Sequence, residues 1–251
     1  MSFQTVKAET DIDLTVKPSG TNSKDDIKQP ELAEKNLIPR INTSTICVGR
    51  SGSGKSVVMS KLLNDPNFWG GTFDLVCLIS PTAKMDDVQA QFPVSNEECV
   101  VTNLKKAPAF LQGLMQLQKE NIEKYGAGNS PLVCIILDDC VADRSFINSN
   151  EFFEIFMKNR HYNFTVVLAS QQYKSISMKA RLQANNVIFF KSPDSETEHL
   201  VYDFCPPGYS RQKFMQLIKF ASDDEYSFLY INMKAPWKER FRKNFNEIIK
   251  L

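Results

Sequence analysis

One eight-residue segment constrains the fold of this chain more than any other. It reads GRSGSGKS over 49–56, with glycine at the first and sixth positions and then lysine and serine. A strand-forming run at 44–48 precedes it, and a helix-forming run at 55–64 follows it. A glycine-rich turn between a strand and a helix lets successive backbone N–H groups point into one concavity, where they bind phosphate oxygens. The segment therefore predicts a phosphate-binding loop.

Buried strands and helices alternate along most of the remaining chain. Runs rich in Val, Ile, Leu and Phe, such as 132–137, lack the polar–apolar alternation of a strand with one solvated face. We expect strands at 44–48, 73–80, 98–102, 132–137, 164–169, 187–190 and 226–233. We expect helices at 55–64, 104–125, 148–160, 195–204, 209–220 and 238–251. The predicted fold class is therefore α/β, with a mostly parallel central sheet and helices on both faces.

The first 37 residues differ in composition from the rest. They contain five lysines against seven acids and show no sustained hydrophobic period. Because such a segment buries little apolar surface, we expect 1–37 to be a polar arm or a disordered tail. Docking of this arm on a neighbouring subunit is the alternative. The second predicted unit, 38–251, is a P-loop ATPase domain that ends in a basic amphipathic helix.

Charge and cysteine usage exclude several classes of protein. Lys and Arg number 30 against 29 Asp and Glu, and a net charge of +1 excludes a protein that coats nucleic acid through a basic surface. The six cysteines form no C-x-x-C pair, and with only two histidines a zinc cluster is not expected. The apolar runs are too short for a membrane span, and the N-terminus lacks an apolar signal segment. We expect a reducing compartment, no secretion and no membrane span.

The phosphate-binding loop predicts a nucleotide and Mg²⁺ as ligands. The ammonium of Lys55 would neutralise charge on the β- and γ-phosphates, and the hydroxyl of Ser56 would hold Mg²⁺. Backbone N–H groups of the loop and the N-terminal end of the following helix would bind the phosphate oxygens. The predicted nucleotide-binding residues are Gly49, Arg50, Ser51, Gly52, Ser53, Gly54, Lys55 and Ser56.

Two adjacent acids follow the buried strand at 132–137. Asp138, at the tip of the strand, is placed to hold Mg²⁺ directly or through water. Asp139 could orient or deprotonate an attacking water. A pair of acids favours hydrolysis of the γ-phosphate bond over nucleotide binding alone. The simpler alternative is that Asp139 caps a turn.

Polar residues near the next strand are further candidates. Gln171, with Gln172 as the alternate, follows the strand at 164–169 and could sense the γ-phosphate. Arg160 precedes that strand, at the end of a predicted helix. The helix dipole favours a cation at that position, which by itself explains an arginine there. Equally, Arg160 could reach the γ-phosphate bound by a neighbouring subunit. Arg181 is a second candidate for that role.

Four segments in this order resemble one superfamily. They are GRSGSGKS at 49–56, ILDD at 136–139, NRHYNFTVVLASQ at 159–171, and the stretch from Arg181 that ends in NVIFF at 190. In these segments the chain resembles the FtsK–HerA superfamily of P-loop motors, and within it the genome-packaging ATPases of poxviruses, giant viruses and virophages. The resemblance covers about residues 38–200.

The resemblance implies a fold, ligands and partners. The fold would be RecA-like, with the strand before Gln171 lying between the phosphate-loop strand and the strand before Asp138. The protein would hydrolyse ATP with Mg²⁺ as a homo-oligomeric, usually hexameric, ring that translocates double-stranded DNA. A capsid protein at a packaging vertex would be a further partner, and the location would be the virion or a viral factory in the host-cell cytoplasm.

The same resemblance assigns roles to individual residues. Catalysis would fall to Lys55, Asp139, Gln171 and Arg160, and metal binding to Ser56 and Asp138. Many members of the superfamily have glutamate at the position of Asp139, and Asp–Asp is closer to the viral branch. In the ring pore, lysines would contact DNA phosphates. The candidates are Lys84, Lys174, Lys179, Lys191 and the basic residues of 234–251.

Three other functions remain as alternatives. One is another FtsK–HerA-type DNA translocase, although conjugation and chromosome-segregation members usually carry membrane helices or large extra domains. A second is a nucleotide-gated assembly protein, which the paired acids speak against. A third is a nucleotide kinase, which would need an arginine-rich lid that the sequence does not show.

Overall fold

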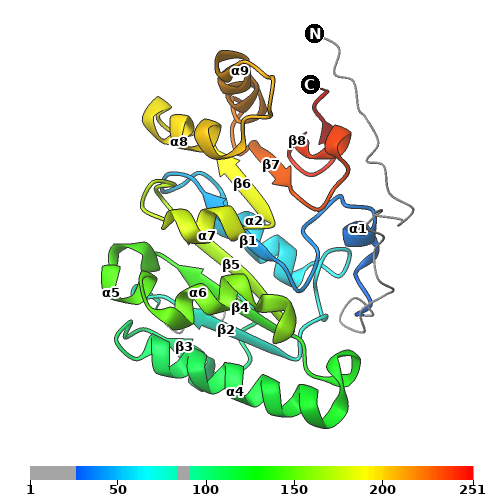
Figure 1. Cartoon of the computed structure of the whole chain (residues 1–251), viewed down its shortest axis with the longest axis vertical. Helices are drawn as coiled ribbons and strands as arrows, with labels where there is room; N and C mark the ends of the chain where they lie inside the picture. Colours follow the sequence, from blue (N-terminus) through cyan, green and yellow to red (C-terminus); the bar gives the residue numbers. More distant parts are fainter. Residues whose placement is uncertain (1–26, 84–90, 251) are drawn as a thin grey trace, which may run out of the picture.

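A single nine-stranded sheet organises the protein, whose computed structural model describes residues 27–83 and 91–250 (Figure 1). The strand order is β3-β2-β4-β5-β1-β6-β7-β8-β9. The strands are β1 Ser44–Val48, β2 Leu75–Ile79, β3 Val100–Val101, β4 Val133–Asp138, β5 Phe164–Ser170, β6 Asn186–Phe190, β7 Phe228–Asn232, β8 Phe241–Lys243 and β9 Glu247–Ile248.

The strands from β3 to β6 are parallel, and those from β6 to β9 are antiparallel. β1 lies between β5 and β6, with Ile46 opposite Leu168 on one side and Val187 on the other. β5 lies between β1 and β4, as the resemblance implied. Because parallel strands end at the same edge, the carboxyl ends of β4, β5, β1 and β6 lie side by side there. This edge carries the phosphate-binding loop.

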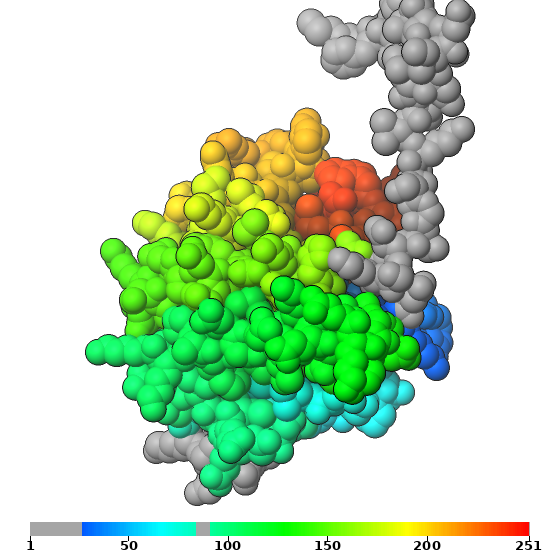
Figure 2. Space-filling model, turned by 60° about the horizontal axis from the view of Figure 1, so that its bottom comes forward, coloured from blue at the N-terminus to red at the C-terminus, as the bar shows by residue number. Residues whose placement is uncertain are grey.

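Helices cover both faces of the sheet, which confirms the predicted fold class. One face packs against α4, α6, α7, α8 and α9, and the other against α1 and α2. These helices are α1 Glu31–Glu34, α2 Lys55–Asn64, α4 Ala107–Tyr125, α6 Asn150–Met157, α7 Met178–Gln183, α8 Asp194–Phe204 and α9 Arg211–Ala221. A further short helix, α5, spans Arg144–Ile147. Figures 1 and 2 show α4 and the C-terminal elements at opposite ends of the molecule.

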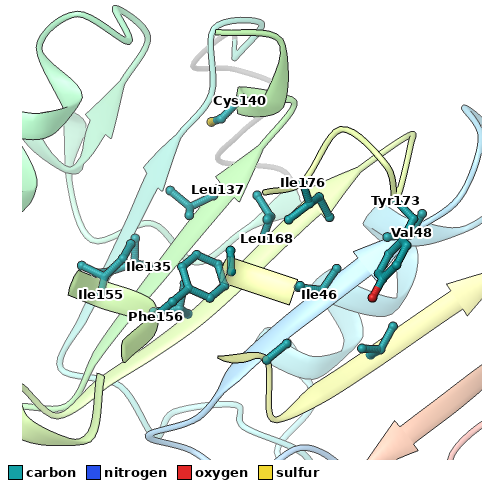
Figure 3. Packing of buried hydrophobic residues seen from close by; sticks show 14 of the residues in the cluster. Ile46, Val48, Ile135, Leu137, Cys140, Ile155, Phe156, Leu168, Tyr173 and Ile176 are labelled. Carbon is teal, nitrogen blue, oxygen red and sulfur yellow. The ribbon is translucent and has the colours of Figure 1, made fainter. Parts of the chain in front are cut away.

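The core on the α6 side shows why these strands are apolar throughout. Ile135 of β4 and Leu168 of β5 are fully buried, and so is Ile155 of α6 (Figure 3). On the other face Cys134 and Ile136 of β4 are equally buried in a second cluster. Since alternate residues of one strand point to opposite faces, burial of both faces requires a continuous apolar run. β4 meets this requirement.

The predicted C-terminal helix at 238–251 is wrong. The chain there forms a short 3₁₀ turn, Trp237–Glu239, and then the antiparallel strands β8 and β9. Phe241 packs edge-on against Phe214 of α9, with ring centroids 5.2 Å apart. Asn244 has φ of 53°, a left-handed conformation that interrupts a helix and makes the turn between the two strands. Tertiary packing therefore overrides the helical period of this segment.

Arg242 explains part of the misassignment of the C-terminal segment. Its side chain is 1% exposed, although the sequence suggested a basic solvent-facing helix. The guanidinium donates hydrogen bonds to the backbone oxygens of Glu239 at 3.1 Å and Phe245 at 3.3 Å. It also pairs with the Glu239 carboxylate at 3.2 Å. Arg242 thus stabilises the end of the sheet and is not part of a basic surface.

Two smaller differences concern helix ends. The helix predicted at 148–160 begins two residues later, as α6, and its N-cap is Ser149, whose hydroxyl accepts a hydrogen bond from the Phe152 N–H at 3.2 Å. The sequence did not predict α7, whose N-cap is Ser177. At six residues, α7 is too short to give a reliable hydrophobic period.

The described part of the predicted N-terminal arm packs on the domain. Ala33 of α1 is fully buried, and Ile27 and Leu32 pack against the cluster on the α2 side of the sheet. Trp69 lies in that cluster and donates a hydrogen bond from its indole to the Pro39 oxygen at 2.8 Å. Residues 1–26 of the arm lie outside the described residues, so the division at residue 37 stays a prediction.

The cysteines are all free thiols, and five of the six are buried. Burial raises the pKa of each of Cys77, Cys134 and Cys140 well above its ordinary value, and that of Cys47 to about 12. Cys205, next to the end of α8, is partly exposed. No helix among the described residues is long and apolar enough to cross a membrane.

Candidate active site

The phosphate-binding loop is held by β5 and β6, the two neighbours of β1. The Gly49 N–H donates to the Ser170 oxygen at 3.2 Å, which ties the start of the loop to the end of β5. A Cβ atom at Gly49 would lie 2.7 Å from Cβ of Phe190 in β6, a distance that backbone and side chain could not tolerate. Gly54 has φ of 102° and serves as the N-cap of α2. These positions need glycine for space and for conformation.

Lys55 is turned back onto the loop. Its side chain is nearly buried, and its Nζ donates hydrogen bonds to the backbone oxygens of Gly49 at 2.7 Å and Arg50 at 3.0 Å. The N–H groups that open α2 have no side-chain cap, so they are available to an anion. Among the described residues, Ser53 Oγ is a buried hydroxyl without a hydrogen-bond partner. The donors at this loop therefore fit a polyphosphate.

The two acids occupy different environments. Asp138 ends β4, and burial raises its pKa to about 6; the neighbouring Asp139 adds to this shift and Lys55 opposes it. Asp139 has φ of 51°, a left-handed conformation that turns the chain away from the strand. Within the described residues no three His, Cys, Asp or Glu side chains cluster closely enough to hold a metal. The oxygens that remain as candidates are those of Asp138, at the end of β4, and of Ser56, in the first turn of α2. They fit Mg²⁺, which binds to one or two protein oxygens together with phosphates and water.

Gln171 lies next to the second acid. Its Nε2 is 3.5 Å from Oδ1 of Asp139, so the ends of β4 and β5 bring the two side chains together. Gln172, the alternate candidate, is used within its own loop, because its Oε1 accepts a hydrogen bond from Ser175 at 2.9 Å. The structure thus separates the two glutamines, and Gln171 is the one beside the acids.

Arg160 lies at the opposite edge of the sheet. It belongs to a 3₁₀ turn, Asn159–His161, that precedes β5, and it lines a pocket with Arg40 and Lys234. β5 has seven residues, so its two ends are roughly 20 Å apart. The phosphate-binding loop follows the other end. Arg160 is therefore remote from Lys55 of its own chain.

Arg181 is buried inside its own chain. Its Nε donates to Oδ2 of Asp203 at 2.8 Å, and its Nη1 donates to the Ile176 oxygen at 3.1 Å. The guanidinium lies 4.9 Å from the centre of the Tyr173 ring, and the Tyr173 hydroxyl donates to the same Asp203 oxygen at 2.8 Å. These contacts argue against Arg181 as an arginine that reaches another subunit.

The Tyr173–Asp203–Arg181 network holds the loop that carries Gln171. Tyr173 is fully buried two residues after Gln171, and Asp203 fixes it from α8 (Figure 3 shows Tyr173). The backbone N–H of Lys174 donates to Glu196 of α8 at 3.0 Å, which adds a second link. Tyr173 and Asp203 could not be predicted from the sequence as supports of the site, because 30 residues separate them and no local pattern joins them.

Replacing Arg181 with methionine should lower the free energy of unfolding by about 3 kcal/mol, because Asp203 would be left as a buried, uncompensated charge. Urea denaturation of the two proteins measures this difference. Lys191→Met is the control, since Lys191 pairs with Asp223 on the surface, where both side chains are at least 70% exposed. Equal stability of Arg181→Met and the parent protein would contradict the structural role of the network.

The described lysines that were predicted to contact DNA lie on different elements: Lys174 follows β5, Lys179 belongs to α7 and Lys191 follows β6. Lys179 lies over the Phe153 ring, with its Nζ 5.4 Å from the ring centre, and Lys191 is in the ion pair with Asp223. The Lys174 side chain is exposed. Lys84 lies outside the described residues. DNA contact by these lysines stays a prediction.

The fold and the phosphate-binding loop define a P-loop ATPase fold with a RecA-like order of strands around the loop. A family model described as "Poxvirus A32 protein" matches residues 33–233. The chain belongs to the poxvirus A32 protein family.

Individual relatives are distant in sequence. Uncharacterized protein L437 of Acanthamoeba polyphaga mimivirus is 25% identical over 202 residues, which are 78% of this chain and 69% of that protein. The crystal structure of B204, the DNA-packaging ATPase from Sulfolobus turreted icosahedral virus, matches with a TM-score of 0.55 and 16% identity. The match covers 77% of this chain and 93% of B204.

A second solved structure was determined with a nucleotide analogue. It is the genome-packaging NTPase B204 from Sulfolobus turreted icosahedral virus 2 in complex with AMPPCP, and it matches with a TM-score of 0.51 and 19% identity. The match covers 76% of this chain and 93% of that protein. These likenesses show that the chain shares the fold of the B204 proteins.

Proposed function

We propose that this chain is an ATP-hydrolysing ring motor that moves double-stranded viral DNA into a preformed capsid. The observation that carries the proposal is the convergence, at one edge of the sheet, of the phosphate-binding loop, the acid pair and Gln171. The support for packaging is the shared fold with B204, which is named as a DNA-packaging ATPase.

In the proposed reaction, Lys55 exchanges two backbone acceptors for phosphate oxygens. Its Nζ leaves the oxygens of Gly49 and Arg50 and neutralises charge on the β- and γ-phosphates. The Ser56 hydroxyl and the Asp138 carboxylate would hold Mg²⁺, which supplies further charge neutralisation when it is bound. The N–H groups that open α2 bind phosphate oxygens from the loop side.

Water activation falls to Asp139 and Gln171 in this proposal. Asp139 accepts a proton from the attacking water, and the Gln171 amide, beside that carboxylate, orients the water toward the γ-phosphorus. The buried network behind Tyr173 keeps Gln171 at this place. The paired acids and the amide together favour hydrolysis over nucleotide binding alone.

A ring is the assembly that this reaction needs. In the proposed ring, a neighbouring subunit supplies its Arg160 to each nucleotide; the position of Arg160 at the edge of the sheet opposite to its own loop supports this arrangement. We propose a homo-oligomer, hexameric by resemblance to other members of the superfamily, with a capsid protein as partner. The site of action would be the virion or a viral factory in the host-cell cytoplasm.

Double-stranded DNA should stimulate ATP turnover, and the stimulation should fall steeply as salt rises, because phosphate contacts release counterions. Phosphate release measured from 50 to 200 mM salt, with and without DNA, tests this. Asp139→Asn is the matched control for contaminating ATPases, since it should be inactive with and without DNA. A turnover rate that is the same with and without DNA at every salt concentration would contradict a DNA motor. Phosphoryl transfer to nucleoside monophosphates would favour a kinase instead.

A further inference from the structure

Tyr226 is an exposed aromatic residue beside the phosphate-binding loop. It lies between α9 and β7, and its side chain is 63% exposed. A Cβ atom at Gly54 would be 3.3 Å from Cδ1 of Tyr226 and 3.4 Å from Cε1 of Phe190. The Tyr226 ring therefore approaches the point where the loop becomes α2. No role proposed above uses it.

The backbone of Tyr226 is held in an unfavourable conformation. Its φ is 62°, in the left-handed region that bulky residues rarely adopt. Ser227 stabilises the turn, because its N–H and its hydroxyl both donate to the Asp224 oxygen, at 3.1 and 2.8 Å. Asp223 and Asp224, before the ring, form surface ion pairs with Lys191 and Lys243. Strain that the surroundings maintain in this way is typical of functional sites.

The topology sets the direction in which a bound nucleotide would extend. β1 carries the loop and lies between β5 and β6. The acid pair and Gln171 follow β4 and β5, so the γ-phosphate end belongs on that side. The ribose and base then extend toward the other side, past β6 and β7. Phe190 ends β6 and Tyr226 precedes β7 on that side.

We propose that Tyr226 is the residue on which the nucleotide base stacks. The inference rests on the proposed binding of ATP and adds a contact to its base. A flat aromatic surface stacks on any base, because each base has a π face, and such a contact is insensitive to base identity. Tyr226 should therefore strengthen the binding of ATP and GTP alike, and it should contribute nothing to a ligand without a base.

The test compares ATP with tripolyphosphate, which carries the phosphates without the base. Calorimetric titration with Mg²⁺ present gives the affinity of each ligand for the full chain and its variants. Tyr226→Asn removes the ring and keeps a residue that tolerates the left-handed conformation. It should weaken ATP binding about tenfold and leave tripolyphosphate binding unchanged. Tyr226→Phe keeps the ring and should bind ATP as the parent protein does.

Tyr125→Asn is the matched control. Tyr125 ends α4 and is 50% exposed, and it lies before β4, near the edge of the sheet opposite the loop. The Tyr125→Asn variant should bind ATP and tripolyphosphate with the affinities of the parent protein. Unchanged ATP affinity in Tyr226→Asn would overturn the stacking role. Equal losses for ATP and tripolyphosphate would also overturn it, since the ring would then only shape the loop. A parent protein that binds neither ligand would refute the proposed ATPase itself.

Discussion

Replacing Lys55 with alanine is expected to lower ATP turnover by about 10³-fold, to the limit of detection. The Lys55 ammonium lies against the loop, where its Nζ donates hydrogen bonds to the backbone oxygens of Gly49 and Arg50. Without it, charge that develops on the phosphates in the transition state loses its nearest compensating group. Phosphate release under saturating ATP measures the effect.

A lysine on the same helix provides the control for Lys55. Lys61 lies on the exposed side of α2, with its Nζ 5.4 Å from the centre of the Phe68 ring. Lys61→Ala should keep the turnover of the parent protein, because the Lys61 ammonium lies over the Phe68 ring and makes none of the hydrogen bonds that Lys55 makes to the loop. Circular dichroism should show that both variants are folded. Near-normal turnover in Lys55→Ala would refute the assignment of the loop as the hydrolytic site.

Arg160→Ala is expected to leave ATP binding intact and to reduce hydrolysis by about 10³-fold, which is the lower range for loss of an arginine supplied in trans. ATP binding should be unaffected because Arg160 lies at the edge of the sheet far from the loop of its own chain, whereas hydrolysis should fall because a neighbouring subunit loses the arginine. Calorimetric titration measures the binding, and single-turnover phosphate release measures the hydrolysis. Arg40→Ala, which alters the same pocket, is the control and should retain hydrolysis.

Mixing the two inactive variants tests whether subunits share sites. A Lys55→Ala chain still carries Arg160, and an Arg160→Ala chain still carries an intact loop. Where a Lys55→Ala chain presents its Arg160 to the intact loop of a neighbouring Arg160→Ala chain, one complete site forms and turnover returns. Full turnover in pure Arg160→Ala protein would contradict the shared site, and so would loss of ATP binding in that variant.

Local patterns in the sequence were sufficient to predict most strands of the sheet. The motif at 49–56 predicted the loop, and the runs at 44–48 and 164–169 became β1 and β5 with at most one residue of difference. These elements are predictable because a strand buried on both faces needs a continuous apolar run. The position of β5 between β1 and β4 came from the resemblance, since periodicity does not encode strand order.

The features that sequence reasoning missed depend on distant parts of the chain. The segment 238–251 has a helical pattern, but Phe241 and Arg242 are buried against partners outside any local window. Arg181 is a candidate by sequence alone, but its guanidinium is bound to Asp203 and lies against Tyr173. The proximity of Tyr226 to Gly54 likewise depends on the pairing of β6 with β7. Contacts of this kind decide which candidates can act.

The uneven burial of the cysteines makes the native sequence suitable for site-selective labelling. Thiol-reactive dyes attack the thiolate, and five of the six thiols are buried. Burial also raises the pKa of four of them, Cys47, Cys77, Cys134 and Cys140. Cys205 is partly exposed, so a dye can reach it, and because partial burial raises its pKa the labelling reaction would need alkaline pH. It follows Asp203 by two positions, at the end of α8. A single fluorophore there would report on movement of α8, and through Asp203 on the loop that carries Gln171, without any engineered cysteine.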